Sequence, residues 1–508
     1  MKVPLQHYPG MNRFVLDWLG GDERFLRRSS TAPHPQPLSP LAGRGELASS
    51  IDQSNRHWGI FAKDQLQRWA RNESVTLIAG QQVGFAGGPL YTLAKIATLV
   101  KMKRELEAKG TSAIAFFWLA TEDHDFDEVA TLNVPAKNGQ LDLLRIRAIR
   151  AAESKAMVGS LPVPEALIAQ LLAAYDMPRP SWLREGITFR DSFAELIASI
   201  FGSEIVLIDA LLPELRRAGA PLFDQIRSKH DDIQAALHAR AHALKAAGYS
   251  EQVVPGDDGQ YTLLFAIEES DRGAAGSQPA GIRRAESPSL HQAAPESTST
   301  SALTRPLLQD FVLAPDVFVG GPAEVAYYAQ IAPLHEMLGV AMPRVALRGH
   351  VLVAPKRVVK AIGRFQLDPA ELFSSADAIL TEREPEGVAR IHALAEEGKR
   401  ELMQRIEAIA ELALPADHSL AGKFNRSIGH IEYHFDKLAA RAVKGLVRKD
   451  KERLAAAREL VATLYPDRHV QDRVVSWFAY WCTHGQHLAD RVIDELEPDS
   501  ACFRIVEL

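Results

Sequence analysis

Cysteine is almost absent from this 508-residue chain, which holds only Cys482 and Cys502. Neither lies in a CxxC pattern, so the sequence excludes a disulfide scaffold and a cysteine-ligated zinc site. Long apolar runs are also missing, because no stretch reaches the roughly 18 uninterrupted apolar residues of a membrane helix. Residues 1–14 lack the apolar segment of a signal peptide. We therefore expect a soluble, cytoplasmic protein with no membrane partner.

A strong excess of one charge is missing as well. The formal net charge is −6, which argues against a general nucleic-acid binder. Hydrophobic residues make up 46% of the chain, enough to bury a large core. The length exceeds what one ordinary core requires, so we expect more than one domain.

Strand and helix patterns alternate through the first part of the chain. The apolar runs are continuous rather than alternating with polar residues, which is typical of a parallel sheet covered by helices on both faces. The fold class is therefore α/β with a Rossmann-like parallel sheet. Strands are predicted at residues 75–80, 113–120, 205–210 and 341–348, a helix at 89–110, and a strand, a Gly-rich turn and a helix within 311–331.

The domain plan has three parts. Residues 1–380 form the core, and two Pro-, Gly- and Ser-rich insertions, 29–46 and 271–302, are predicted to be disordered surface loops. Residues 381–465 have helical spacing of apolar residues on either side of a turn, which predicts an antiparallel coiled-coil arm. Residues 466–508 are expected to return as helices that pack on the core.

Ligands of parallel sheets bind beyond the carboxyl ends of the strands, and three turns are predicted to lie there. The first is "AGQQVGFAGGPLYTLAK", residues 79–95, in which glycines would let a ligand approach and the helix N-terminus would favour an anion. It matches neither a P-loop nor GxGxxG. A purely structural turn is the alternative, and the paired amides of Gln81 and Gln82 favour polar recognition.

The second turn, "TEDHDFDE" at residues 121–128, is strongly acidic. It could hold a metal, bind an ammonium group and supply a general base, or cap a following helix. On an extended chain Glu122 and His124 face one way, and Asp123, Asp125 and Asp127 face the other. This split disfavours a metal, so we predict ligand contact and no metal site.

The third turn is "GGPAEVAYYAQ", residues 320–330. Its two glycines and Glu324 repeat the logic of the first turn. Tyr327 and Tyr328 either close a pocket or belong to the core. In the strand that follows, Arg344 could hold a carboxylate in a bidentate contact, whereas Arg348 is expected in a surface salt bridge.

Three motifs, "GQQVGFAGGPLYTLAK", "FFWLATEDHDFDEVATLNV" and "GGPAEVAYYAQIAPLHEMLGVAMPRVALR", resemble the cysteine-adding enzymes of bacillithiol biosynthesis, a cysteine ligase family. The resemblance implies a Rossmann-like core akin to nucleotidylyltransferases and class I aminoacyl-tRNA synthetases, connecting-peptide insertions, and a coiled-coil arm that forms a homodimer. It also implies that L-cysteine is joined to the amine of glucosaminyl-malate. Residues 466–474, "PDRHVQDRV", depart from the family's "PNG…LQER" segment.

The expected site follows from these motifs and the resemblance. ATP or another nucleotide is the candidate for activating the cysteine carboxyl group, although the sequence establishes no cofactor. The rival interpretations are a metal-dependent nucleotidyl or phosphoryl transferase and a non-catalytic dimeric scaffold. The expected catalytic residues are Asp123, His124 and Asp125, and the expected substrate-binding residues are Gly80, Gln81, Gln82, Gly88, Pro89, Tyr91, Lys95, Glu122, Asp127, Gly320, Gly321, Glu324, Tyr327, Tyr328 and Arg344.

Overall fold

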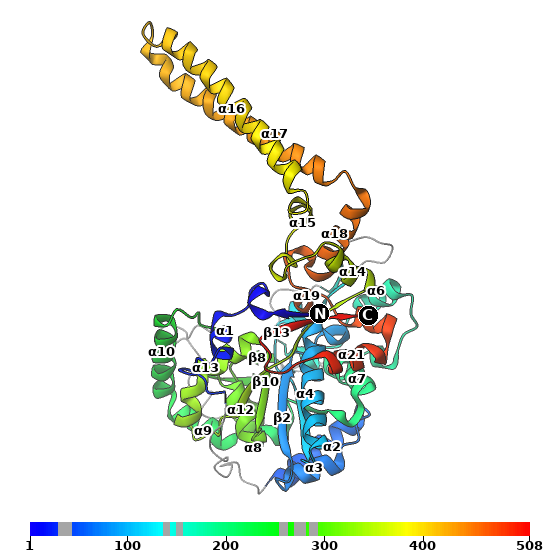
Figure 1. Cartoon of the computed structure of the whole chain (residues 1–508). Helices are drawn as coiled ribbons and strands as arrows, with labels where there is room; N and C mark the ends of the chain where they lie inside the picture. The colour runs from blue at the N-terminus through cyan, green and yellow to red at the C-terminus, as the bar shows by residue number, and fades with distance from the viewer. Residues whose placement is uncertain (29–42, 136–142, 149–155, 253–262, 269–280, 284–292) are drawn as a thin grey trace, which may run out of the picture. The chain divides into compact units, whose positions relative to one another are not determined.

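The computed structural model divides the chain into two compact units (Figure 1). It describes residues 1–28, 43–135, 143–148, 156–252, 263–268, 281–283 and 293–508. The first unit contains residues 1–353, 469–506 and 508, and the second contains residues 354–468 and 507. The division after Val353 comes earlier in the chain than the boundary expected after residue 380.

A five-stranded parallel sheet forms the centre of the first unit, in the order β11-β10-β2-β3-β6. Side chains of the interior strand β3 (Ala113–Leu119) are buried on both faces. The ring of Phe116 lies edge-on to Trp69, with centroids 5.3 Å apart, and the ring of Phe117 stacks on Phe193 at 6.3 Å. Because consecutive side chains of a strand point to opposite faces, helices must cover both sides. The predicted α/β, Rossmann-like class is confirmed.

The order of the strands reverses between β2 and β10. From β2 the chain proceeds outward to β3 and β6, whereas from β10 it proceeds to β11 on the other side. A crevice forms at such a reversal, beyond the carboxyl ends of the strands, and ligands bind there in this class of sheet. The Gly-rich turn after β2 (Val75–Gln81) and the turn after β10 (Val317–Gly320) flank that crevice.

The outer strand β6 (Val206–Asp209) is closed by a side chain. The amide of Asn55 donates to the carbonyl of Leu207 at 2.8 Å and accepts from its N–H at 2.9 Å. Asn55 is fully buried. The amide thus replaces a neighbouring strand and satisfies the edge, which would otherwise present unpaired backbone groups.

Three segments differ from the sequence expectation. Residues 311–313 end helix α12 rather than forming a strand, because Ala314 adopts a left-handed conformation (φ 45°) and Pro315 stops the helix. Within the two segments predicted to be disordered, helix α2 begins at Arg44 and strand β9 spans Thr298–Thr300. The rest of those segments lies mainly outside the described residues. Strands at both chain ends, β1 and β13, were not anticipated and pair antiparallel.

The C-terminal segment returns to the first unit, where it packs on the Gly-rich turn after β2. The N–H of Leu90 donates to the carbonyl of Val475 at 2.9 Å, and the indole Nε1 of Trp477 donates to the carbonyl of Gly87 at 2.9 Å. Trp477 is fully buried. Helices α20 and α21 then follow, and the segment ends in strand β13.

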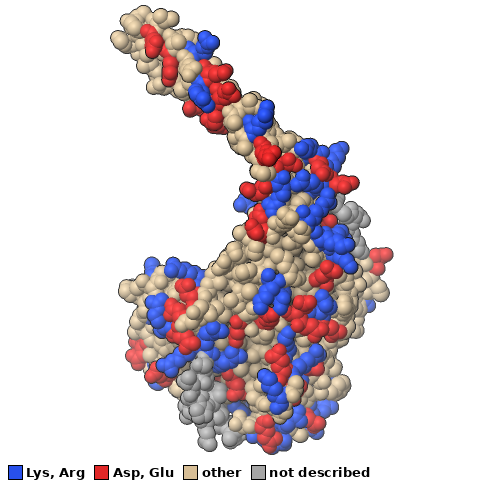
Figure 2. Space-filling model, viewed as in Figure 1, with Lys and Arg blue, Asp and Glu red and all other residues tan. Residues whose placement is uncertain are grey.

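The second unit is helical, and α16 and α17 form its antiparallel arm. Phe435 lies against Gly398, and Leu446 lies against Gly387. Later residues of α16 therefore contact earlier residues of α17, so the two helices run antiparallel. Lys399 bridges to Asp436 at 2.8 Å across the pair. Acidic and basic side chains alternate along the arm in Figure 2. The arm is a pair of long helices, as predicted, but the second helix ends at Val447 and α18 begins separately at Lys451.

No helix among the described residues is both long enough and apolar enough to cross a membrane. Beside the central sheet, the strands form two small three-stranded sheets and one hairpin. The described strands are β1 (Lys2–Pro4), β2 (Val75–Gln81), β3 (Ala113–Leu119), β4 (Thr131–Pro135), β5 (Leu143–Arg147), β6 (Val206–Asp209), β7 (Leu264–Glu268), β8 (Gly281–Arg283), β9 (Thr298–Thr300), β10 (Val317–Gly320), β11 (Arg344–Leu347), β12 (His350–Ala354) and β13 (Cys502–Glu507).

The described α-helices of the first unit are α1 (Arg13–Leu19), α2 (Arg44–His57), α3 (Lys63–Ala70), α4 (Leu90–Ala108), α5 (Phe126–Val129), α6 (Glu165–Tyr175), α7 (Phe189–Phe201), α8 (Pro213–Ala218), α9 (Ala220–Ser228), α10 (His230–Ala246), α12 (Arg305–Leu313), α13 (Pro322–Met337), α19 (Gln471–Val474), α20 (Phe478–His484) and α21 (Gln486–Glu495). Those of the second unit are α14 (Lys356–Arg364), α15 (Ala376–Thr381), α16 (Pro385–Ala413), α17 (Ala421–Val447) and α18 (Lys451–Leu464).

The contact between Gly87 and Trp477 leads to a stability prediction. Gly87 has φ +82°, and an added Cβ would lie 2.1 Å from Cζ2 of Trp477. We expect Gly87→Ala to destabilise the protein by about 2–4 kcal/mol, through overpacking and backbone strain. Urea unfolding followed by tryptophan fluorescence measures the change. Gly45→Ala, where no described atom lies within 4 Å of the added methyl group, is the matched control. An unchanged midpoint for Gly87→Ala would contradict the close approach.

Candidate functional site

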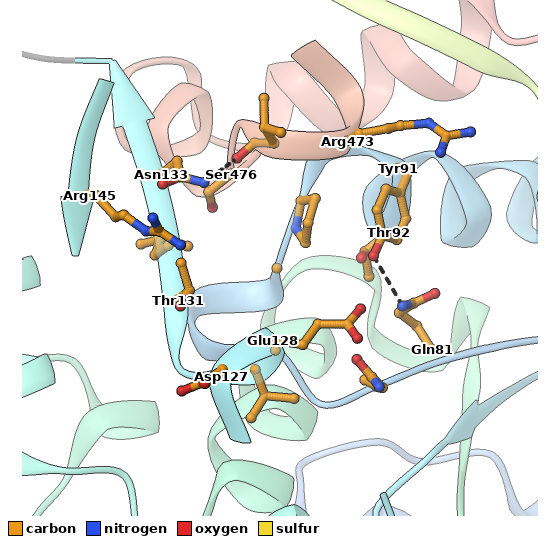
Figure 3. A pocket seen from close by; sticks show the side chains of 17 residues that line it. Gln81, Tyr91, Thr92, Asp127, Glu128, Thr131, Asn133, Arg145, Arg473 and Ser476 are labelled. Carbon is orange, nitrogen blue, oxygen red and sulfur yellow. Dashed lines mark hydrogen bonds between the residues drawn. The ribbon is translucent and has the colours of Figure 1, made fainter. Parts of the chain in front are cut away.

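A pocket of about 240 Å³ lies where the Gly-rich turn after β2 meets the acidic turn after β3 (Figure 3). Its walls come from the start of α4, from α5 and the β4–β5 hairpin, and from the returning C-terminal segment. The residues that line it are Gln81, Gln82, Gly84, Gly88, Pro89, Tyr91, Thr92, Asp127, Glu128, Val129, Thr131, Leu132, Asn133, Arg145, Arg473, Val474 and Ser476.

Six of the residues expected to contact substrate line this pocket, and they come from two of the three predicted turns. They are Gln81, Gln82, Gly88, Pro89, Tyr91 and Asp127. The parallel strands β2 and β3 bring their carboxyl ends together, so the two turns meet although helix α4 separates them in the chain.

The acidic turn is not an extended strand, and the predicted alternation of its side chains is wrong. Its last residues form the short helix α5, which Asp125 caps by accepting from the N–H of Glu128 at 3.0 Å. The carboxylate of Asp123 accepts from Nε2 of Gln82 at 2.5 Å and from the N–H of His124 at 2.7 Å. The side chain of His124 is 67% exposed. The three residues expected to be catalytic therefore build and flank the turn, and none lines the pocket.

Glu122 points away from the pocket into the protein. Its carboxylate forms a buried ion pair with Arg216 and accepts from the hydroxyl of Ser299 at 2.7 Å. Arg216 also donates to the carbonyls of Ala210 at 2.8 Å and Thr298 at 2.7 Å. The pair ties the acidic turn to the end of β6 and to β9. Breaking such a pair would leave a buried charge uncompensated, so Glu122 holds the turn in place.

Lys95 is buried, at 3% exposed, and is not among the residues that line the pocket. Its ammonium donates to the carbonyl of Gly80 at 2.9 Å and to Oε1 of Gln81 at 2.8 Å, and pairs with Glu324 at 2.6 Å. An ammonium group has three hydrogens, and these three acceptors use all of them. Burial lowers the pKa of Lys95, and the neighbouring Glu324 carboxylate opposes that shift.

The third predicted turn supports this lysine rather than the pocket. Glu324 also accepts from the N–H of Gly321 at 2.7 Å, which caps α13. Gly320 is buried at the end of β10 beside Phe318. None of the three lines the pocket.

The other residues expected near this turn lie elsewhere. The ring of Tyr328 is fully buried, and its hydroxyl donates to Asp310 at 3.1 Å. Tyr327 packs edge-on against it, so both belong to the core. Arg344 pairs with Asp499 at 2.7 Å, away from the pocket. Arg348 is buried rather than on the surface, and it pairs with Asp472 at 2.9 Å.

Glu128 is the pocket residue with the most perturbed carboxyl group, and the sequence reasoning did not select it. Figure 3 shows its carboxyl directed toward Gln81 and Tyr91 across the pocket. Partial burial raises the pKa of Glu128, and the nearby carboxylates of Asp125 and Asp123 raise it further, whereas a hydrogen bond with Gln82 and the charge of Lys95 oppose the rise. A raised carboxyl pKa in a pocket is typical of a general base. It is the last residue of the acidic turn, and its place on the short helix α5 was not anticipated.

Two arginines also line the pocket, and no motif in the sequence indicated either of them. Arg145 projects from β5 of the hairpin, and Arg473 comes from α19, in the segment where the chain departs from the family pattern. Arg145 forms no ion pair with any described residue. The pocket therefore has carboxylates on α5 and the guanidinium of Arg145 on the hairpin, whereas the guanidinium of Arg473 lies 6.0 Å from the ring of Tyr8 and is directed away from α5 in Figure 3.

No group of three His, Cys, Asp or Glu side chains among the described residues is arranged to hold a metal ion.

The chain matches two family models, "Bacillithiol biosynthesis BshC, N-terminal Rossmann-like domain" over residues 21–349 and "Bacillithiol biosynthesis BshC, C-terminal coiled-coil domain" over residues 351–508.

Several relatives carry the name "Putative cysteine ligase BshC". The protein from Solibacter usitatus is 30% identical over 92% of this chain and 93% of its own length. The proteins from Koribacter versatilis and Bacillus cereus are 29% identical over 97% of both chains, and 26% identical over 83% of this chain and 82% of the relative, respectively. Both domains and almost the full length are covered. The chain belongs to the bacillithiol biosynthesis BshC family and is a ligase.

Proposed function

We propose that this ligase joins L-cysteine to the amine of glucosaminyl-malate in the cytoplasm, forming the amide bond of bacillithiol, and that the pocket on α4 and α5 is the site of the reaction. The observation that carries the proposal is the carboxyl of Glu128, which has a raised pKa and faces hydrogen-bonding groups of α4 across the pocket. Membership of the family supplies the reaction class.

Amide formation requires an unprotonated amine and an acceptor for the proton it loses. The amine attacks the carbonyl carbon of a cysteine carboxyl group activated as a phosphate or nucleotidyl ester, as the C–O bond to the activating group breaks and that group leaves with the electron pair. As the new C–N bond forms, the amine nitrogen becomes positively charged and transfers a proton to a neighbouring base. We assign that role to Glu128 rather than to Asp123, His124 or Asp125. Asp123 and Asp125 are engaged in hydrogen bonds that form the turn, and His124 is directed to solvent.

The charges of the pocket suit the proposed substrates. An amine-bearing substrate gains from the carboxylates of Asp127 and Glu128, and a substrate with two carboxylates gains from guanidinium groups. Arg145 and Arg473 line the pocket, whereas Arg344, the residue expected to hold malate, is paired with Asp499.

The Gly-rich turn itself does not fit a nucleotide triphosphate. Lys95, the cation expected to meet a phosphate, has all three hydrogens engaged by protein acceptors, and Glu128 faces the start of the same helix. We therefore derive no step through a nucleotide at this turn. ATP is tested as a variable of the assay.

The reaction is tested with the purified full-length chain, L-cysteine and glucosaminyl-malate, with and without ATP and divalent metal. We expect a product with the mass and free thiol of bacillithiol, because family and pocket chemistry both support this amide. Omission of L-cysteine, and its replacement by L-serine, are the controls. Absence of product under every nucleotide and metal condition would remove the proposal.

The raised pKa of Glu128 predicts a pH dependence. A base works when deprotonated, so kcat/KM should fall as the pH drops through a value above that of an ordinary glutamate, about 4.3. Glu128→Gln should lower the rate by roughly 10²–10⁴-fold and abolish this acid limb. The titration of the substrate amine gives a second limb that both proteins share. Asp127→Asn is the matched control and should keep the limb of Glu128; an unchanged pH profile in Glu128→Gln would exclude this base.

We also propose that the chain is a homodimer through the arm. Large apolar side chains on α16 and α17 are more than half exposed, including Leu394 at 57% and Leu438 at 63%. A second copy would cover this surface. Light scattering on the full chain should give a dimer mass, and Leu394→Glu with Leu438→Glu should shift it toward the monomer. Gln404→Glu adds charge on the same helix as a control, and a monomeric wild type would refute the assignment.

A further inference from the structure

The side-chain amide of Gln81 connects a buried lysine to a tyrosine of the pocket. Its Oε1 accepts from the ammonium of Lys95 at 2.8 Å, and its Nε2 donates to the hydroxyl of Tyr91 at 3.2 Å (Figure 3). Lys95 and Tyr91 lie one turn apart at the start of α4, and Gln81 ends β2. The three groups form a short chain that leads from the interior to the pocket.

The direction of this chain is set by the lysine. The two ends of an amide have nearly the same shape, so hydrogen-bonding partners decide which end is the oxygen. A lysine ammonium has donors and no acceptor, so only the oxygen of Gln81 can face Lys95. The NH2 end must then face Tyr91 as a donor.

Tyr91 consequently receives a hydrogen bond and keeps its own proton for another partner. No described residue accepts from its hydroxyl. Burial raises the pKa of Tyr91, and the nearby carboxylates of Glu128 and Glu324 raise it further, so the phenol remains protonated at working pH. The hydroxyl lines the pocket, where it can donate to an oxygen of a bound molecule.

A second hydroxyl lies beside it. Thr92 is 1% exposed and lines the pocket, and its Oγ1 has no hydrogen-bond partner among the described residues. A buried hydroxyl without a partner is costly, so a ligand oxygen would relieve it. The N-terminal end of α4 also favours negative charge on that oxygen. The hydroxyls of Tyr91 and Thr92 and the N-terminal end of α4 all favour a ligand oxygen that accepts hydrogen bonds and carries no proton itself.

We propose that Tyr91 donates a hydrogen bond to the oxygen of the acyl group that the amine attacks, and that Lys95 acts as a positioning residue by setting the direction of Gln81. The inference rests on the proposed ligase reaction. That oxygen gains negative charge as the C–N bond forms, so the hydrogen bond strengthens in the transition state. Glu128, across the pocket, takes the proton of the amine.

An isosteric substitution reverses the chain. In Gln81→Glu the carboxylate still accepts from Lys95, but it cannot donate, so the hydroxyl of Tyr91 donates its hydrogen bond to this carboxylate and no longer to the ligand. We expect Gln81→Glu and Tyr91→Phe each to lower kcat/KM by roughly tenfold to a hundredfold, mainly through kcat. The double variant should lose no more than Tyr91→Phe alone, because both changes remove the same donor.

The double variant also separates direction from charge. If Gln81→Glu acted only by adding negative charge, its effect would persist in the Tyr91→Phe background, and the inference would be overturned. Wild-type turnover by Tyr91→Phe, or a loss confined to KM, would overturn it as well. Tyr433→Phe, on the arm, is the matched control and should turn over normally.

Lys95 is tested in the same way. Lys95→Met frees the amide to turn, so it should cost activity in the wild-type background and nothing further beside Tyr91→Phe. Thermal melting checks that the variant is folded. An equal loss in both backgrounds would show that Lys95 acts independently of Tyr91. If wild-type protein makes no bacillithiol at all, the ligase proposal fails, whereas an active wild type with an unaffected Tyr91→Phe refutes this inference alone.

Discussion

A buried ammonium group must be surrounded by acceptors, and Lys95 imposes that requirement on the centre of the sheet. It donates to the carbonyl of Gly80 in β2 and to the amide oxygen of Gln81, and it pairs with the carboxylate of Glu324, which caps α13. One side chain therefore connects the end of β2 with the start of α13, the helix that follows β10. Desolvation of a charge is repaid only when every hydrogen is accepted, so each of these partners constrains the others.

The acidic turn is built by the same principle. Its carboxylates divide between structure and pocket. Glu122 forms an ion pair with Arg216, Asp123 accepts a hydrogen bond from Gln82, and Asp125 caps the start of α5. The two remaining carboxylates, those of Asp127 and Glu128, line the cavity. The density of negative charge that is conspicuous in the sequence thus fixes the position of a smaller number of groups that face a ligand.

The sheet and two of the three rim turns could be predicted because they depend on local signals. Continuous apolar runs give buried strands, and Pro and Gly mark the limits of α4. Pairing partners are not local: nothing near Lys95 in the chain announces Glu324, and nothing near Tyr328 announces Asp310. The side chains of residues 121–128 do not alternate as expected, because a capped helical turn takes the place of an extended chain. Arg145 and Arg473 reach the pocket through tertiary folding alone.

The hydrogen bond from Trp477 to Gly87 joins residues 390 positions apart. Domains fold as units while a chain is synthesised, N-terminal parts first. Here the sheet and its Gly-rich turn emerge long before the residues that cover them, and the whole arm is made in between. The pocket acquires this wall only after the arm has been made. A chain made only as far as the arm would hold the carboxylates of α5 without the segment around Val474 and Ser476 that lines the same pocket.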